Sequence, residues 1–196
     1  MSHINSIGAS VFSDLSIALP TTQPDMASLD TATEFQALFA KEISSVGGTK
    51  DVGTFVRVKN VREFPAMGTP PNVVNVPTYG QKTSQQVQGQ SDAPNMEITI
   101  NFVASEWAKD VGNLLGTLVG DGNQYAFRFS LLNSEPTGSG ATKYSSTSAG
   151  LGTVQNSQFF WVGKVEALQV NPQLTDATTA TITLTLQSAM FGAYTS

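Results

Sequence analysis

The clearest pattern in the chain is a strict alternation of apolar and polar residues in two segments, 96–104 and 180–188. A period of two is typical of a strand that buries one face and exposes the other. The apolar series are Met96, Ile98, Ile100 and Phe102 in the first segment, and Ala180, Ile182, Leu184 and Leu186 in the second. The opposite face of both predicted strands is polar and carries almost no charge.

Three further segments favour strands. Residues 54–64 alternate until the pattern slips near Val61, which predicts a bulge. Residues 124–132 alternate large apolar with smaller or polar residues and predict a half-buried strand. Residues 158–171 carry large apolar groups on both faces near Phe160 and Trp161. We expect that arrangement where a neighbouring chain covers an edge or outer face.

Two segments favour helices. Thr31 and Glu34 form a capping-box pattern, and apolar residues follow at helical spacing until Gly47, which predicts a helix over 32–45. Ser105 caps a second predicted helix, which opens at Glu106, carries one apolar stripe and ends near Gly120.

The remaining segments read as irregular. Residues 1–50 are interpreted as an extended N-terminal arm followed by the short helix, and 51–196 as one mainly β domain. Five prolines and a polar run make 65–95 a long projecting loop, with one short β-like piece at 73–79. Residues 133–157 are rich in glycine and serine and predict a mobile surface loop. A loop as long as 65–95 is the leading candidate for an interface.

Composition narrows the class of protein. The 196 residues contain no cysteine, which excludes disulfides, zinc–thiolate sites and cysteine nucleophiles and favours a reducing compartment. No signal peptide or run of 18 apolar residues is visible, so no membrane association is expected. Charged residues are only 13% of the chain. Such low charge suggests that protein partners cover much of the surface.

Residues that would carry chemistry are absent or badly placed. The only histidine, His3, lies in the predicted arm, where a catalytic base would have no fixed position. The segment 138–143 lacks the spacing of a phosphate-binding loop. We therefore predict no enzyme, no catalytic residues, no metal site and no cofactor.

Nucleic-acid binding is not indicated either. The chain has 10 basic and 15 acidic residues, and its basic cluster is only Arg57, Lys59 and Arg62. Tight phosphate binding takes many more clustered positive charges. DNA could therefore pass along this protein without binding to it tightly.

The order of elements resembles that of the tail tube proteins of long-tailed bacteriophages. The resemblance spans about residues 54–190 and rests on VPTYGQKTSQQVQGQSDAPNMEITINFVASEW, a short helix, and then YAFRFSL. The arm and helix at 1–50 lie outside it.

The resemblance implies a mainly β fold, a β-sandwich or partial barrel with a flanking helix, whose sheets join between subunits into a ring-shaped barrel. It also implies six subunits per ring, rings stacked into a tube, and a virion component assembled in the host cytoplasm. The implied partners are further copies of the chain, a tape measure protein, and tail terminator and tip proteins. Double-stranded DNA would transit the tube without sequence-specific binding.

Two sets of residues follow as hypotheses. The polar faces of the two clearest strands would line the lumen, with the residues Glu97, Thr99, Asn101, Thr181, Thr183, Thr185 and Gln187. Apolar residues would make contacts between subunits, namely Phe64, Pro70, Val74, Tyr79, Phe160 and Trp161.

Three alternatives remain open. The polar face could be ordinary solvated outer surface, since a pattern gives polarity and not surroundings. The chain could be a tube protein of a bacterial secretion machine, which shares the assembly logic. It could also be a monomeric glycan-binding β-sandwich.

Overall fold

The computed structural model describes residues 12–18, 26–39, 41–42, 54–58, 60–68, 71–91, 95–104, 112–132, 135–136 and 157–194. These residues form a mainly β structure, as the alternating patterns predict. The strands are β1 (Asp14–Ala18), β2 (Lys41–Glu42), β3 (Thr54–Val58), β4 (Val61–Glu63), β5 (Pro71–Val76), β6 (Gln85–Ser91), β7 (Met96–Asn101), β8 (Tyr125–Leu131), β9 (Ser157–Asn171), β10 (Thr179–Leu186) and β11 (Phe191–Tyr194). The helices are α1 (Ala32–Leu38), α3 (Gly112–Leu118) and the short 3-10 turn η1 (Met26–Ser28).

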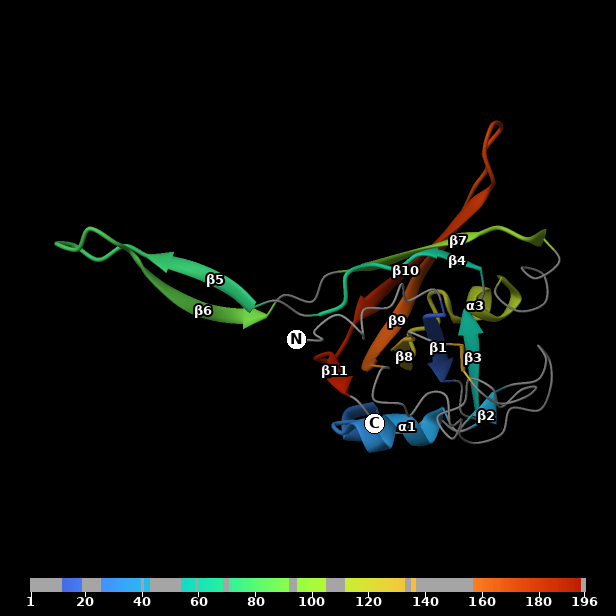
Figure 1. The fold of residues 1–196 in the computed structure, drawn as a ribbon, viewed down its shortest axis with the longest axis horizontal. Coiled ribbons are helices and arrows are strands. Elements are labelled where there is room, and N and C mark those ends of the chain that lie inside the picture. Colours follow the sequence, from blue (N-terminus) through green and yellow to red (C-terminus); the bar gives the residue numbers. More distant parts are fainter. Residues whose placement is uncertain are drawn as a thin grey trace, which may run out of the picture.

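One large sheet runs in the order β2-β3-β1-β8-β9-β10-β7-β4, and β11 also pairs with β9 (Figure 1). The long strand β9 joins its two halves, because residues 157–163 pair with β8 and residues 163–171 pair with β10. Gly163 stands at the crossover, where any Cβ would collide with the carbonyl oxygen of Thr185. The terminal strands of this order are β2 and β4, so the described sheet is open and not a closed barrel.

The two halves of the sheet enclose the main core. Apolar side chains of β1, β3, β8 and β9 pack there against those of β7, β10 and α3. Trp161 of β9 is fully buried in this core and stacks on Phe127 of β8, with ring centroids 5.5 Å apart. The two halves of the sheet therefore share one hydrophobic core, as the two sheets of a β-sandwich do.

The N-terminal segment is an integral part of this sheet. Residues Asp14–Ala18, interpreted from sequence as part of an extended arm, form β1 between β3 and β8. All five residues of β1 are buried. The predicted boundary between an arm at 1–50 and a domain at 51–196 is therefore wrong, because β1 would leave a gap in the middle of the sheet if it were removed.

At the slip near Val61 the chain passes from one half of the sheet to the other, and the β4–β7 register also shifts between Val61 and Glu63, as the predicted bulge implies. β3 ends at Val58 and pairs with β1, whereas β4 begins at Val61 and pairs with β7. Between them Asn60 adopts φ 60°, a left-handed conformation that asparagine tolerates better than most residues. Its carbonyl accepts a hydrogen bond from the N–H of Asn101 at 2.8 Å.

The strand β8 is buried on both faces, which corrects the half-buried prediction. Its odd-numbered residues enter the main core, and Ala126, Arg128 and Ser130 on its other face are also fully buried. The helix α1 covers that second face, with Phe35 and Phe39 packed over the sheet. The sequence correctly predicts a strand here. Its period of two does not show that α1, a distant segment of the same chain, covers the second face.

The first predicted helix is present over a shorter range, and α3 lies within the range predicted for the second. α1 begins after Thr31, as the capping box predicts, and ends at Leu38, so the prediction to residue 45 is too long. The Glu34 carboxylate accepts hydrogen bonds from the Thr31 hydroxyl at 2.9 Å and from two backbone N–H groups. Mainly because of the Thr31 hydroxyl, the pKa of Glu34 is lowered. Residues 105–111 and nearly all of the Gly/Ser loop 133–157 lie outside the described residues.

Candidate functional site

A broad polar face runs across β7, β10 and the second half of β9, on the side of the sheet away from the core. The burial of β10 alternates strictly, with its alanine, isoleucine and leucines buried and its threonines partly exposed. In β7 the same alternation leaves Glu97 and Asn101 exposed and Thr99 half-buried. The one-sided alternation predicted for both strands is therefore confirmed.

Strand register brings the seven predicted lumen residues together. Thr181 lies opposite Thr99, and Thr183 lies opposite Glu97. Gln187, just past the end of β10, donates from Nε2 to the Thr185 hydroxyl oxygen at 3.5 Å. These residues form one continuous surface, which we call the polar face. Its position in a lumen stays a prediction.

The neighbouring strand β9 adds polar residues that the sequence analysis missed. The Thr185 hydroxyl donates to Glu166 Oε1 at 2.9 Å, and Asn171 Nδ2 donates to the Thr181 hydroxyl at 3.0 Å. The β9–β10 register shifts between Thr183 and Leu184. That irregularity breaks the period of two in β9, so no simple alternation signalled that these side chains share the face.

The chemistry of the polar face is that of hydroxyls and amides with few charges. Its carboxylates Glu97 and Glu166 are accompanied by one lysine, Lys164, which lies opposite Thr185. Hydrogen-bonding groups of this kind keep the polar face hydrated. Its excess of carboxylates does not attract phosphate groups. Within the described residues no group of three or more His, Asp or Glu side chains could hold a metal ion.

A tyrosine–aspartate pair fixes the turn that leads into β8. The Tyr125 hydroxyl donates a short hydrogen bond to Asp121, and Asn123 donates to the same carboxylate. Burial alone would raise the pKa of Asp121, but the hydrogen bonds and the charge of Lys164 lower it overall. Burial, followed by the bond to Asp121, raises the pKa of Tyr125 to about 12.

The second candidate feature is a two-stranded hairpin, β5–β6, that projects from the body of the molecule (Figure 1). It occupies most of the predicted loop 65–95, so the loop prediction is corrected to a hairpin. The strand β6 was missed because QQVQGQS has little apolar character and a central glycine. The register pairs it with the valine-rich strand β5, for example Val74 with Val87.

The hairpin has no core of its own. Every side chain from residue 72 to 89 is exposed, valines included. The exposed large apolar residues are Val73, Val74, Val76, Tyr79 and Val87. An isolated two-stranded hairpin is at best marginally stable in water, so a surface that covered this one would stabilise it.

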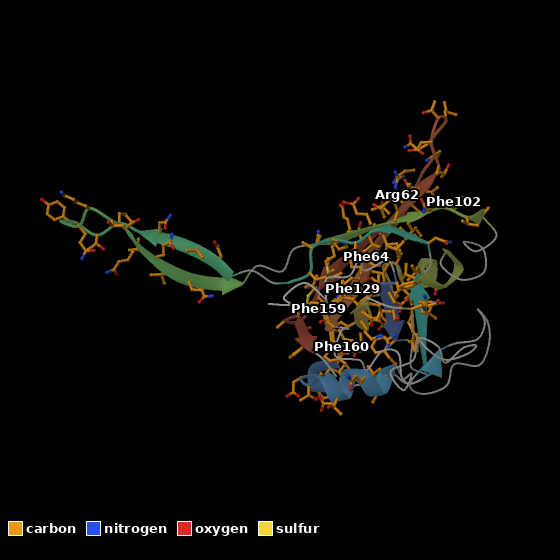
Figure 2. All side chains as sticks on the ribbon, in the orientation of Figure 1. Arg62, Phe64, Phe102, Phe129, Phe159 and Phe160 are labelled. Carbon is orange, nitrogen blue, oxygen red and sulfur yellow. The ribbon has the colours of Figure 1, made fainter. Side chains whose placement is uncertain are left out.

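The six predicted interface residues fall into three groups. Val74 is 51% exposed and Tyr79 is fully exposed on the hairpin, whereas Pro70 lies outside the described residues. Phe64 is half-buried and packs on Phe129, with centroids 4.8 Å apart (Figure 2). Phe64 therefore belongs largely to the core of the single chain.

Phe160 and Trp161 are not available for contacts between subunits. Both side chains are fully buried within the single chain. Phe160 stacks on Phe35 of α1, and Trp161 stacks on Phe127 in the main core. The expectation that a neighbouring chain covers this part of β9 is therefore wrong, since α1 and the folded sheet supply the cover.

Comparison with known proteins gives one kind of match. No protein-family model matches the chain, and no curated protein does. Among solved structures, the chain is similar to the SPP1 tail tube, determined by solid-state NMR and cryo EM, with 12% identity and a TM-score of 0.40. The match covers 67% of this chain and 64% of that chain. No helix within the described ranges is long and apolar enough to cross a membrane.

Proposed function

We propose that this chain is a structural subunit that assembles with copies of itself into the tail tube of a bacteriophage. The observation that carries the proposal is the β5–β6 hairpin, which exposes four valines and a tyrosine without any core of its own. A second copy of the chain is the partner that such a surface would meet in a self-assembled tube. Covering the hairpin would remove both its apolar exposure and its unpaired strand edges.

The polar face supports the second half of the proposal, a channel for DNA. The tube would consist of stacked rings, with six copies in each, and the polar face would line the lumen. A wall of hydroxyls and amides with an excess of carboxylates would let DNA slide, since it offers phosphates no array of positive charge. The tape measure protein would occupy this lumen before DNA, with terminator and tip proteins at the ends of the tube.

The test is assembly of the purified chain at rising concentration, followed by light scattering and negative-stain electron microscopy. The matched variant replaces Val73, Val74, Val76 and Val87 by threonine, which keeps the β-branched shape and exchanges one methyl of each side chain for a hydroxyl. We expect hollow tubes or stacked rings from the wild-type chain. The variant should give a folded monomer with an unchanged circular dichroism spectrum and no tubes.

Two outcomes would contradict the proposal. A wild-type chain that stays monomeric at every concentration and binds a glycan saturably would favour the sugar-binding alternative. Tubes of normal length from the four-threonine variant would show that the hairpin does not drive assembly.

A further inference from the structure

Two hairpins leave the body of the molecule in different directions (Figure 1). One is β5–β6, and the other is the end of β9–β10, whose turn spans residues 172–178. Each turn presents one large apolar side chain that is fully exposed, Tyr79 in the first and Leu174 in the second. In the described part of the chain, no other large apolar residue exceeds 52% exposure.

A local hydrogen bond orders the first tip, and a bond to a neighbouring segment anchors the base of the second. In the first, Gln81 N–H donates to the Thr78 carbonyl at 3.2 Å, and Gly80 supplies the positive φ of 85° that the turn requires. In the second, the base of the turn is tied to the sheet, because Phe102 N–H donates to the Thr178 carbonyl at 2.9 Å. The two apolar side chains are thus presented on ordered turns.

The tips also carry opposite charges. Lys82 is the only charged residue in the hairpin 71–91, and Asp176 is the only one in the turn 172–178. Each therefore pairs one exposed apolar group with one charge, three residues apart in the first tip and two in the second. Charge complementarity of this kind selects orientation and partner more than it adds affinity.

Within one chain the two tips point away from each other (Figure 1), so a contact between them must join two copies. We propose that the β9–β10 turn of one subunit docks on the β5–β6 tip of another, with Leu174 against Tyr79 and Asp176 beside Lys82. A contact between two different surfaces is head-to-tail and builds rings or filaments. This inference rests on the proposed function and names the surface that the hairpin meets.

The test uses the absence of cysteine from the chain. Tyr79→Cys and Leu174→Cys variants are each mixed with wild-type chain or with one another, assembled, and oxidised. We expect a disulfide-linked dimer on a non-reducing gel only from the mixture of the two variants. A third variant, Thr33→Cys on the exposed side of α1, replaces either partner as the control for random collision and should give no link.

Charge reversal supplies an independent measurement. Lys82→Glu and Asp176→Lys should each raise the critical concentration for assembly by about two- to five-fold, the range expected of an exposed ion pair. The double reversal should restore it. Tubes that contain both cysteine variants but yield no 79–174 link, or a double reversal that fails to restore assembly, would overturn this inference alone. A wild-type chain that never assembles would overturn the proposed function and this inference with it.

Discussion

The Phe35 ring of α1 stacks on the Phe160 ring of β9, with centroids 5.5 Å apart and planes 19° apart. Both side chains have no exposed surface. The contact fixes the helix to the face of the sheet that would otherwise present Phe55, Phe160 and Val162 to water.

Replacing Phe35 by alanine should therefore lower the free energy of unfolding by about 3 to 5 kcal/mol, the range for removing a buried phenylalanine. Urea unfolding followed by tryptophan fluorescence measures the change. Thr33→Ala, an exposed change on the same helix, should stay within about 0.5 kcal/mol. Equal effects from the two changes would mean that α1 does not pack on the sheet as described.

A buried ionic cluster holds β1 in place. Asp14 accepts from Arg57 Nε at 2.6 Å and from the Ser16 hydroxyl at 2.6 Å, and its Oδ2 lies 3.7 Å from Arg128 Nη2. The Arg128 guanidinium also lies 4.8 Å from the ring centroids of both Phe39 and Phe55. Arg128 of β8 therefore connects β1, through Asp14, with the end of α1, through Phe39.

Asp14→Asn should lower the free energy of unfolding by about 3 to 5 kcal/mol, because it removes a buried negative charge that faces both Arg57 and Arg128. Arg128→Met removes the buried charge and keeps the apolar contacts of the stem. In the Arg128→Met background, Asp14→Asn should cost clearly less than it does alone, and unfolding of the four chains in urea gives the coupling. Strict additivity would contradict a direct interaction between the two charges.

The polar face makes a prediction about DNA passage. Lysines in place of Thr183 and Thr185 would stand beside Glu97 and Glu166, so subunit stability should change by less than about 0.5 kcal/mol. In virions assembled with the variant, DNA ejection should slow, because phosphates would meet a ring of added positive charge. Glutamates at the same two positions are the matched control and should leave ejection unchanged. Normal ejection from the lysine variant, in tubes of normal length, would remove the polar face from the lumen.

Tyr125 predicts a loss of stability at alkaline pH. Its pKa is about 12 in the folded chain and 10.0 without the fold, so between these values the unfolded state has lost a proton that the folded state keeps. Stability then falls as pH rises from 10 towards 12, and the contribution is complete below pH 10. Urea midpoints measured across this window should fall less steeply for Tyr125→Phe than for the wild-type chain. Parallel pH profiles would show that the tyrosine does not titrate as described.

Sequence patterns were reliable wherever one face of a strand meets water. The alternation at Met96 and Ile182 correctly gave both the strands and their buried faces. It failed for β8, because Arg128 and Ser130 read as solvent-facing when α1 in fact covers them. A period of two reports a difference between faces, and it does not report how a distant helix will cover the second one.

The polar face was predicted more completely than the hairpin. Its threonines belong to strands with a clear pattern, whereas β6 has no buried face to create one. Glu166 was missed for a related reason, since the irregular register of β9 removes the period. The tip residue Leu174 follows Pro172 in an exposed turn, and nothing in its local pattern distinguishes it from an ordinary loop residue.

Because β1 lies between β3 and β8, the sheet cannot be completed until both of these later strands have been synthesised. Ser16 meets Arg128 across 112 positions of the chain, so the first strand must wait for β8 before it has neighbours on both sides. Contacts of such long range slow folding, because the intervening loop must be ordered first. A nascent chain on the ribosome would therefore carry its projecting hairpin before its sheet is complete. If the chain assembles as proposed, this strand order would expose the assembly hairpin of an incomplete subunit before its own sheet has closed.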